Sequence, residues 1–292
     1  MKSLLKCTYD DYVPYFWSKD SILTKFKLEK SNLIRSLRVK YWHKIASKYP
    51  PFSPFFDNAL RNKKLSDCTN ENIRDIYKSG TTTIKNILNE NDLKILSDFI
   101  STKELKSNIN YIQFELTKST SFIRQKILKK LFPIYDNFFP LPHRNNDHEK
   151  IYVGVRVDFS HDGIDASPAT ANWHADRFVP TINAIYFPFG SNWGEFEKDI
   201  GSPVITQEDF QYYVSARRLN SPTDENYRDQ LYYPSKQRVS RKFTLKNNTM
   251  LVGTHHIQHR RSPIKTKGQR IAIFIDHYNF FTRHHLKANS LR

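Results

Sequence analysis

The stretch Ile151-Tyr-Val-Gly-Val-Arg-Val-Asp-Phe159 decides the fold class of this chain. Apolar residues occupy every second position, and this period of two is typical of a β-strand with one apolar face. Comparable stretches predict further strands at residues 181–188, 239–246, 249–259 and 270–279. The second half of the chain is therefore expected to consist mainly of β-sheet.

Upstream of these strands the apolar residues recur with helical spacing. Apolar side chains at steps of four predict an amphipathic helix over residues 31–48, with mostly basic residues at the remaining positions. Such a helix either packs on its own protein or lies on an anionic membrane surface. Two further helices are expected. One begins after Asn89, whose side chain suits an N-cap, and one covers residues 121–132 and is ended by Pro133.

A run of helices followed by a run of strands predicts an α+β fold, with the strands closing into a sandwich or barrel. A chain of 292 residues can bury a full core, and a β-rich fold of this length often forms one domain. We expect a basic helical extension over residues 1–78 and one β-rich domain over residues 79–292.

The cysteine content and the N-terminus predict a cytoplasmic location. Cys7 and Cys68 are too few for a disulfide framework and lack the spacing of a zinc site. The first residues meet Asp10 and Asp11 before an apolar stretch of signal-peptide length can form. No window approaches the roughly 18 apolar residues of a membrane span.

The chain carries 46 Lys and Arg against 29 Asp and Glu, a net charge of +17. Such an excess often marks proteins whose partners are nucleic acids or anionic membrane surfaces. The charge is spread along a chain rich in Lys, Asn and Ile, so compositional bias is a second explanation. At this point the partner can be either a small-molecule substrate or a polyanion.

A metal-binding pattern lies in the β-rich half. His174 is the only histidine followed two residues later by an acidic residue, Asp176, and in an extended segment both side chains point the same way. In the predicted strand 249–259 the histidines at 255 and 259 share one face, so both His255 and His259 are candidates for a third ligand. Two imidazoles and one carboxylate leave about three coordination positions open, which oxygen activation at iron(II) requires.

Arg270 follows His259 by eleven residues, across a basic turn. An antiparallel pair joined this way is expected to put the two residues side by side at one end of a sheet. A buried arginine there offers a rigid fork for the distal carboxylate of a dicarboxylate such as 2-oxoglutarate. Weaker candidates for substrate contacts are Arg156 and Asp158, on the polar face of their strand, and Arg177 beside the metal pair; a structural role is the alternative for each.

Two longer stretches carry a resemblance to a known family. Asn172-Trp-His-Ala-Asp-Arg-Phe-Val-Pro-Thr-Ile-Asn-Ala-Ile-Tyr-Phe-Pro188 looks like the first metal motif of the phytanoyl-CoA dioxygenase-like family. Asn248-Thr-Met-Leu-Val252, His259-Arg-Arg261 and Gly268-Gln-Arg270 resemble its second metal and co-substrate motif. The similarity spans residues 80–284, and nothing comparable is found in the first 78 residues.

The resemblance implies an iron(II)- and 2-oxoglutarate-dependent oxygenase on a double-stranded β-helix, a jelly-roll or cupin-like core with flanking helices. It assigns the metal ligands to His174, Asp176 and His259, and the 2-oxoglutarate carboxylate to Arg270. The implied reaction is hydroxylation of a C–H bond with O2, releasing succinate and CO2. The substrate is an unidentified small molecule, with an anionic or carrier-linked compound suggested by the basic residues.

Two other classes compete with the oxygenase. One is an inactive barrel that binds a polyanion, and the other is a metal-bound, lectin-like barrel without redox chemistry. The chain has no Walker motif, no Gly-x-Gly-x-x-Gly, no Cys-x-x-Cys and no Gly-x-Ser-x-Gly.

Overall fold

A computed structural model describes about half of the chain. The described residues are 52–103, 111–116, 120–138, 151–160, 173, 182–190, 195–201, 203–204, 239–244, 246–254, 257–261 and 268–276. The helices are η5 (Ser53–Phe55), α3 (Asn58–Asp67), α4 (Glu71–Ser79), α5 (Glu90–Ser101) and α6 (Ser121–Phe138). The strands are β1 (Thr81–Lys85), β2 (Tyr111–Glu115), β3 (Tyr152–Ser160), β4 (Ile182–Phe189), β5 (Glu195–Asp199), β6 (Ser240–Thr244), β7 (Asn247–Thr254), β8 (His259–Arg261) and β9 (Gly268–Asp276).

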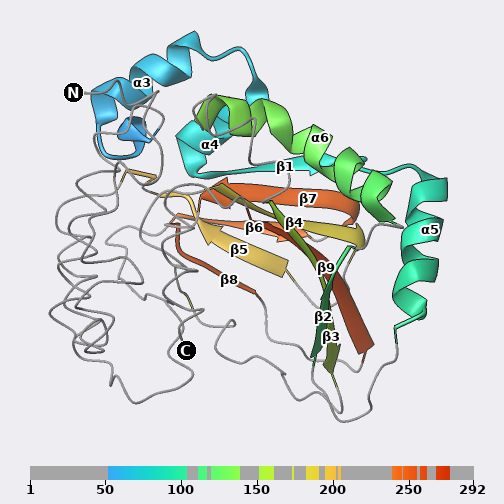
Figure 1. Cartoon of the computed structure of the whole chain (residues 1–292). Helices are drawn as coiled ribbons and strands as arrows, with labels where there is room; N and C mark the ends of the chain where they lie inside the picture. Colours follow the sequence, from blue (N-terminus) through green and yellow to red (C-terminus); the bar gives the residue numbers. More distant parts are fainter. Residues whose placement is uncertain are drawn as a thin grey trace, which may run out of the picture.

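The described strands form two antiparallel sheets (Figure 1). The larger sheet has the order β1-β7-β4-β9-β3-β2, and the smaller has the order β6-β5-β8. The sheets pack against each other through one apolar cluster, to which the larger sheet contributes Phe187, Leu251 and Ala272 and the smaller contributes Phe196 and Phe243. This mixture of helices and antiparallel sheets confirms the predicted α+β class.

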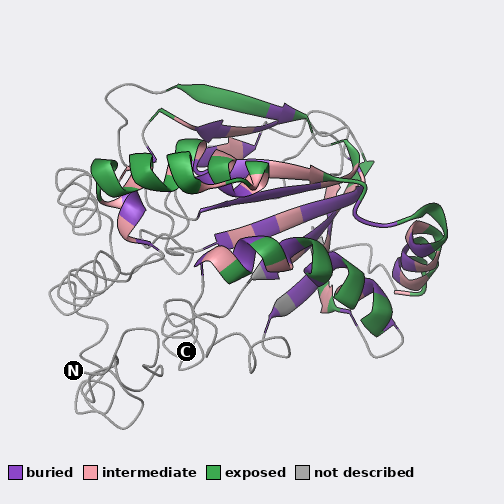
Figure 2. Ribbon diagram, turned by 90° about the horizontal axis from the view of Figure 1, so that it is seen from above, coloured by how far each residue is buried: buried purple, intermediate pink, exposed green. Residues whose placement is uncertain are grey.

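The other face of the larger sheet is covered by helices. Val153, Val155 and Val157 of β3 belong to the same buried cluster as Ile123 and Ile127 of α6. Figure 2 shows helices with exposed outer surfaces in front of strands that are mostly buried, whereas β6 at the top is largely exposed. The polar residues of β3 point the other way, since Arg156 lies directly opposite Ala272 in the space between the sheets. The apolar face predicted for β3 therefore packs against the helices, and its polar face is directed to the space between the sheets.

Residues 52–79 belong to the same core as the larger sheet. Phe55, Tyr77 and Phe138 form an aromatic cluster with ring centroids 5.1 to 5.9 Å apart. Burial raises the pKa of Tyr77 to about 12, although its hydroxyl accepts a hydrogen bond from Asn137. The domain boundary after residue 78 remains a prediction, and the predicted helix 31–48 lies outside the described residues.

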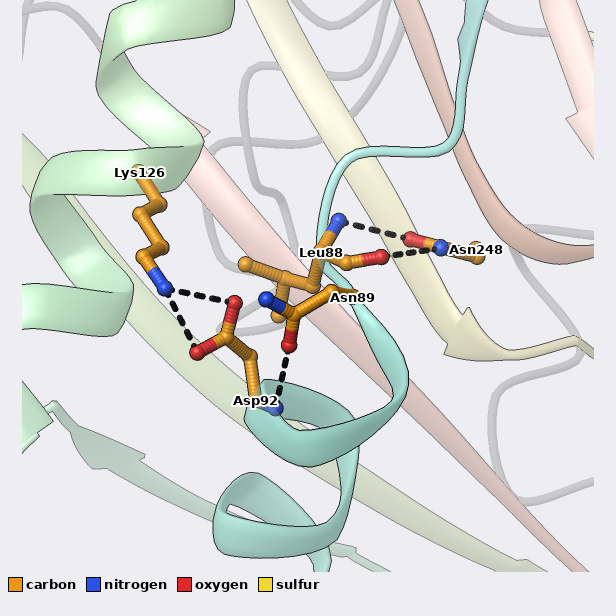
Figure 3. A network of polar contacts seen from close by, with 5 residues as sticks. All are labelled: Leu88, Asn89, Asp92, Lys126 and Asn248. Carbon is orange, nitrogen blue, oxygen red and sulfur yellow. Dashed lines mark hydrogen bonds and ion pairs between the residues drawn. The ribbon is translucent and has the colours of Figure 1, made fainter.

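Asn248 ties the start of β7 to the connection between β1 and α5 (Figure 3). Its Nδ2 donates to the Leu88 carbonyl at 2.6 Å, and its Oδ1 accepts from the Leu88 N–H at 3.0 Å and from the Tyr186 hydroxyl at 2.8 Å. The φ of Asn248 is 54°, a left-handed conformation that asparagine tolerates better than most residues. The helix α5 then begins as predicted, with the Asn89 side chain accepting from the N–H of Asp92 at 2.8 Å.

One predicted helix end is wrong. Pro133 does not end α6, which continues to Phe138. Proline removes one N–H and clashes with the carbonyl four residues earlier, here that of Lys129. Pro133 and Lys129 both lie on the exposed face, where water can satisfy the carbonyl, while Ile134 and Tyr135 continue the buried stripe. Burial of that last turn outweighs the local cost of the proline.

The predicted strand 249–259 is also wrong, because it is two strands in different sheets. β7 ends at Thr254, and β8 begins at His259 after the chain has crossed to the smaller sheet. At the crossing the Ile257 side chain packs against Gly80, where an added Cβ would lie 2.4 Å from it. Gly80 has φ 71° and its carbonyl accepts from the Thr254 N–H at 2.9 Å. The alternation of residues in the sequence continues from β7 to β8, so nothing in the sequence indicates that the chain changes sheet there.

None of the helices in the described parts of the chain is long and apolar enough to cross a membrane.

Candidate metal centre

His259 is held in one orientation and one protonation pattern. Its side chain is buried, and its ring stacks on Phe196 with centroids 5.4 Å apart and an interplanar angle of 20°. Its Nδ1 lies 3.0 Å from the Ile257 carbonyl oxygen. A carbonyl only accepts hydrogen bonds, so Nδ1 carries a proton, and in the neutral ring Nε2 then has the lone pair. This is the arrangement that fixes the tautomer of metal-binding histidines.

Trp173 lies against Arg260, the residue that follows His259. The guanidinium of Arg260 stands 4.8 Å from the centre of the Trp173 ring. Arg260 is held in turn by Glu197 of β5, whose Oε2 accepts from Nε and from Nη2, each at 2.8 Å. The contact therefore joins Trp173 and Arg260, which are the sequence neighbours of two predicted metal ligands, His174 and His259.

Glu197 remains ionised in this contact. Partial burial acts to raise the pKa of Glu197, but hydrogen bonds from Ser240 and Arg260, with the charges of Arg260 and Lys242, outweigh burial and lower it. A negative Glu197 keeps the Arg260 guanidinium over the Trp173 ring.

The remaining predicted metal ligands lie outside the described residues. These are His174 and Asp176, together with the rival candidate His255 and the predicted substrate contact Arg177. Within the described ranges no group of three His, Cys, Asp or Glu side chains could hold a metal ion, and of the three predicted ligands these ranges include His259. Its donor nitrogen fits iron(II), for which imidazole is a usual ligand.

Arg270 forms an ion pair with the buried Asp158, directly opposite it on β3, and the Arg270 side chain itself is 11% exposed. Asp158 Oδ2 accepts from Arg270 Nη2 at 2.5 Å and from Nε at 3.2 Å, while Oδ1 accepts from Arg156 Nε at 2.7 Å. Burial lowers the pKa of Arg270, the charge of Asp158 opposes this, and Arg261 and Arg156 add to the lowering. Arginine is nevertheless always protonated in proteins, so the guanidinium is a fixed cation.

The sequence predicted that His259 and Arg270 lie side by side at one end of a sheet, and this prediction is wrong. His259 is on β8 of the smaller sheet and Arg270 on β9 of the larger one. They nevertheless border the same space. Arg261, two residues after His259 on the same buried face of β8, is close enough for its charge to lower the pKa of Arg270.

Lys198 is a further residue at this place that sequence reasoning missed. It is buried on β5, directly opposite His259, and its Nζ lies 2.4 Å from where a Cβ on Gly253 would stand. The glycine therefore leaves room for the ammonium group between the sheets. The alternation in Glu195-Phe-Glu-Lys-Asp199 could have indicated that Phe196 and Lys198 share a face.

No protein-family model matches the sequence, and no curated protein is similar to it. Solved structures offer only distant likenesses. HygX from Streptomyces hygroscopicus, solved with nickel and 2-oxoglutarate, has a TM-score of 0.37 at 13% identity, covering 71% of this chain and 86% of its own. A prolyl-4-hydroxylase from Pseudomonas putida has a TM-score of 0.38 at 10% identity, covering 71% and 98%. An oxidoreductase of the 2OG-Fe(II) oxygenase family from Burkholderia pseudomallei has a TM-score of 0.41 at 9% identity, covering 72% and 88%. Since all three TM-scores are below 0.5, these likenesses establish neither the family nor the activity of this chain.

Proposed function

We propose that this protein is an iron(II)- and 2-oxoglutarate-dependent oxygenase, built on a double-stranded β-helix and similar to the phytanoyl-CoA dioxygenase-like family. One observation supports the proposal: Trp173, which precedes the predicted ligand His174 in the sequence, packs on Arg260, which follows the predicted ligand His259. The proton on Nδ1 of His259 supports it further, because it leaves Nε2 as the metal-binding nitrogen.

Each residue of the proposed site has a distinct role. His174, Asp176 and His259 hold iron(II), and two imidazoles with one carboxylate leave positions open for a chelating co-substrate and O2. Arg270 binds the distal carboxylate of 2-oxoglutarate through its planar fork. Iron, 2-oxoglutarate and O2 together supply the oxidising chemistry, with succinate and CO2 as by-products.

The rest of the chain orients these groups and excludes water. Phe196 covers one face of the His259 ring, and the apolar cluster between the sheets closes the space beyond it. Exclusion of water strengthens the attraction between Arg270 and a carboxylate, because the local dielectric constant is lower than that of bulk water.

The substrate is proposed to be a small molecule that is hydroxylated at a C–H bond. Buried cations border the space between the sheets, among them Lys198 and Arg261, and they favour an anionic or carrier-linked compound. Arg156 and Arg177 are the proposed substrate contacts.

Turnover of 2-oxoglutarate without any other substrate tests this proposal. Enzymes of this type consume the co-substrate slowly on their own, so the purified chain with iron(II), ascorbate and O2 should form succinate. His259→Ala should abolish this activity, whereas Arg241→Gln, on the exposed strand β6, should retain it. Succinate formation that is equal in wild type and His259→Ala would contradict the proposal.

A further inference from the structure

The interaction between Asp158 and Arg270 uses only one edge of the arginine fork. A guanidinium has five N–H donors. Asp158 Oδ2 accepts along the side edge, from Nε and Nη2. The end edge, which consists of one Nη1 hydrogen and the second Nη2 hydrogen, remains geometrically suited to a second planar acceptor such as a carboxylate.

Asp158 itself is fixed from two sides. Its side chain is 3% exposed, and its second oxygen accepts from Arg156 at 2.7 Å. Both arginines are anchored on neighbouring strands, with Arg270 directly opposite Asp158 in the β3–β9 register. The carboxylate therefore has little freedom to rotate, and the guanidinium that it holds is equally restricted.

We infer that Asp158 is a positioning residue, which holds the side edge of Arg270 so that the end edge is oriented for the distal carboxylate of 2-oxoglutarate. The inference rests on the proposed function, and it gives Asp158 a role different from the substrate contact expected from the sequence. Asparagine cannot replace Asp158, because its amide has one acceptor atom for two arginines and would direct N–H donors at the other.

Asp158 can affect binding of a dicarboxylate through its charge or by positioning Arg270, and the two effects have opposite signs. If it acted only through its charge, Asp158→Asn would make the site more positive and strengthen binding of a dicarboxylate. If it positions Arg270, the same change loosens the fork and weakens that binding. We expect a loss of about tenfold, which is the usual effect of losing a charge-assisted hydrogen bond.

The test compares two 2-oxo acids on the nickel-loaded protein, since nickel occupies such sites without reacting with O2. 2-Oxoglutarate and pyruvate share the chelating 2-oxo carboxylate, and only 2-oxoglutarate has the distal carboxylate. The measured quantity is the ratio of their dissociation constants by isothermal titration calorimetry. Wild type should prefer 2-oxoglutarate, Arg270→Met should lose the preference, and Asp158→Asn should reduce it about tenfold. Asp158→Glu keeps the charge but displaces the carboxylate, so it should reduce the preference as well, and it serves if Asp158→Asn does not fold.

Asp92→Asn is the matched control. Asp92 is as buried as Asp158, with its side chain 4% exposed, and it holds Lys126 with both oxygens at 2.7 Å on the helical side of the larger sheet (Figure 3). This variant loses a buried ion pair remote from the site, so its preference should equal that of wild type. In the Arg270→Met background, Asp158→Asn should cause no further change.

The outcomes separate the two proposals. If the nickel-loaded wild type binds neither acid, the proposed function fails. If wild type prefers 2-oxoglutarate and Arg270→Met does not, while both Asp158 variants keep the preference or increase it, the positioning role is overturned and the proposed function stands. If Asp92→Asn reduced the preference for 2-oxoglutarate as much as Asp158→Asn does, the positioning role would also be overturned. A general loosening of the fold would then explain both results.

Discussion

Replacing Arg260 by glutamine should weaken metal binding without unfolding the protein. Glutamine keeps most of the side-chain length but loses the charge that interacts with the Trp173 ring at 4.8 Å and with Glu197 at 2.8 Å. A cation–π contact contributes about 0.5–2 kcal/mol and a surface ion pair about 0–1 kcal/mol. The Arg260 side chain is 42% exposed, so solvent screening favours the lower part of both ranges. The loss is then about 0.5–1 kcal/mol.

That free energy holds Trp173, the residue before the proposed ligand His174, against β8. If it is transmitted to the ligand set, the affinity for a divalent metal falls about two- to fivefold. Isothermal titration with nickel(II) measures this directly, and denaturant unfolding should show a change of about 1 kcal/mol or less. Arg241→Gln is the matched control, since the Arg241 guanidinium lies 5.2 Å from the centre of the Phe243 ring on the exposed strand β6, with β5 between it and β8. Equal metal affinities in the two variants would refute the idea that Arg260 organises the site.

Two further predictions concern stability. Asn248→Ala should lower the free energy of unfolding by about 3–4 kcal/mol, because it removes three hydrogen bonds of about 1 kcal/mol each and strains a left-handed residue. Asn248→Gly should recover about 1 kcal/mol of this by relieving the strain, and denaturant unfolding that gave identical values for both would contradict the conformational argument. Because the pKa of Tyr77 is raised from 10.0 to about 12, its contribution to stability is constant below pH 10 and falls as the pH rises from 10.0 to about 12, where the unfolded chain ionises first. Tyr77→Phe should reduce that alkaline loss in pH-dependent unfolding without abolishing it, since burial raises the pKa of Tyr186 too; an unchanged pH profile would contradict the assignment.

Local patterns made part of the fold predictable. The alternation in β3 required only that one face be apolar, and the Asn89 cap required only a side chain two or three residues from the N–H groups it serves. The two errors arose where tertiary burial overrode a local rule. Pro133 stays inside α6 because the following turn is buried, and the stretch around Thr254 crosses between sheets although its period of two continues.

The predicted site depended on spacing, and spacing carries no information on partners that are distant in sequence. His259 and Arg270 were predicted as residues of one site, yet the ion pair between Arg270 and Asp158 joins residues 112 positions apart. The contact between Trp173 and Arg260 and the burial of Lys198 opposite His259 likewise depend on the pairing of the two sheets. The metal ligands His174 and Asp176 stay predictions of the sequence.

The central claim is that His174, Asp176 and His259 bind iron(II) together with 2-oxoglutarate. The most direct test is the visible spectrum of the anaerobic protein after addition of iron(II) and 2-oxoglutarate, because chelation of the metal by a 2-oxo acid produces a weak charge-transfer band. The account predicts this band in wild type, its loss in His174→Ala and His259→Ala, and its retention in Arg241→Gln. A folded wild-type protein that binds both additions without the band, or a band that persists in both histidine variants, would contradict the account.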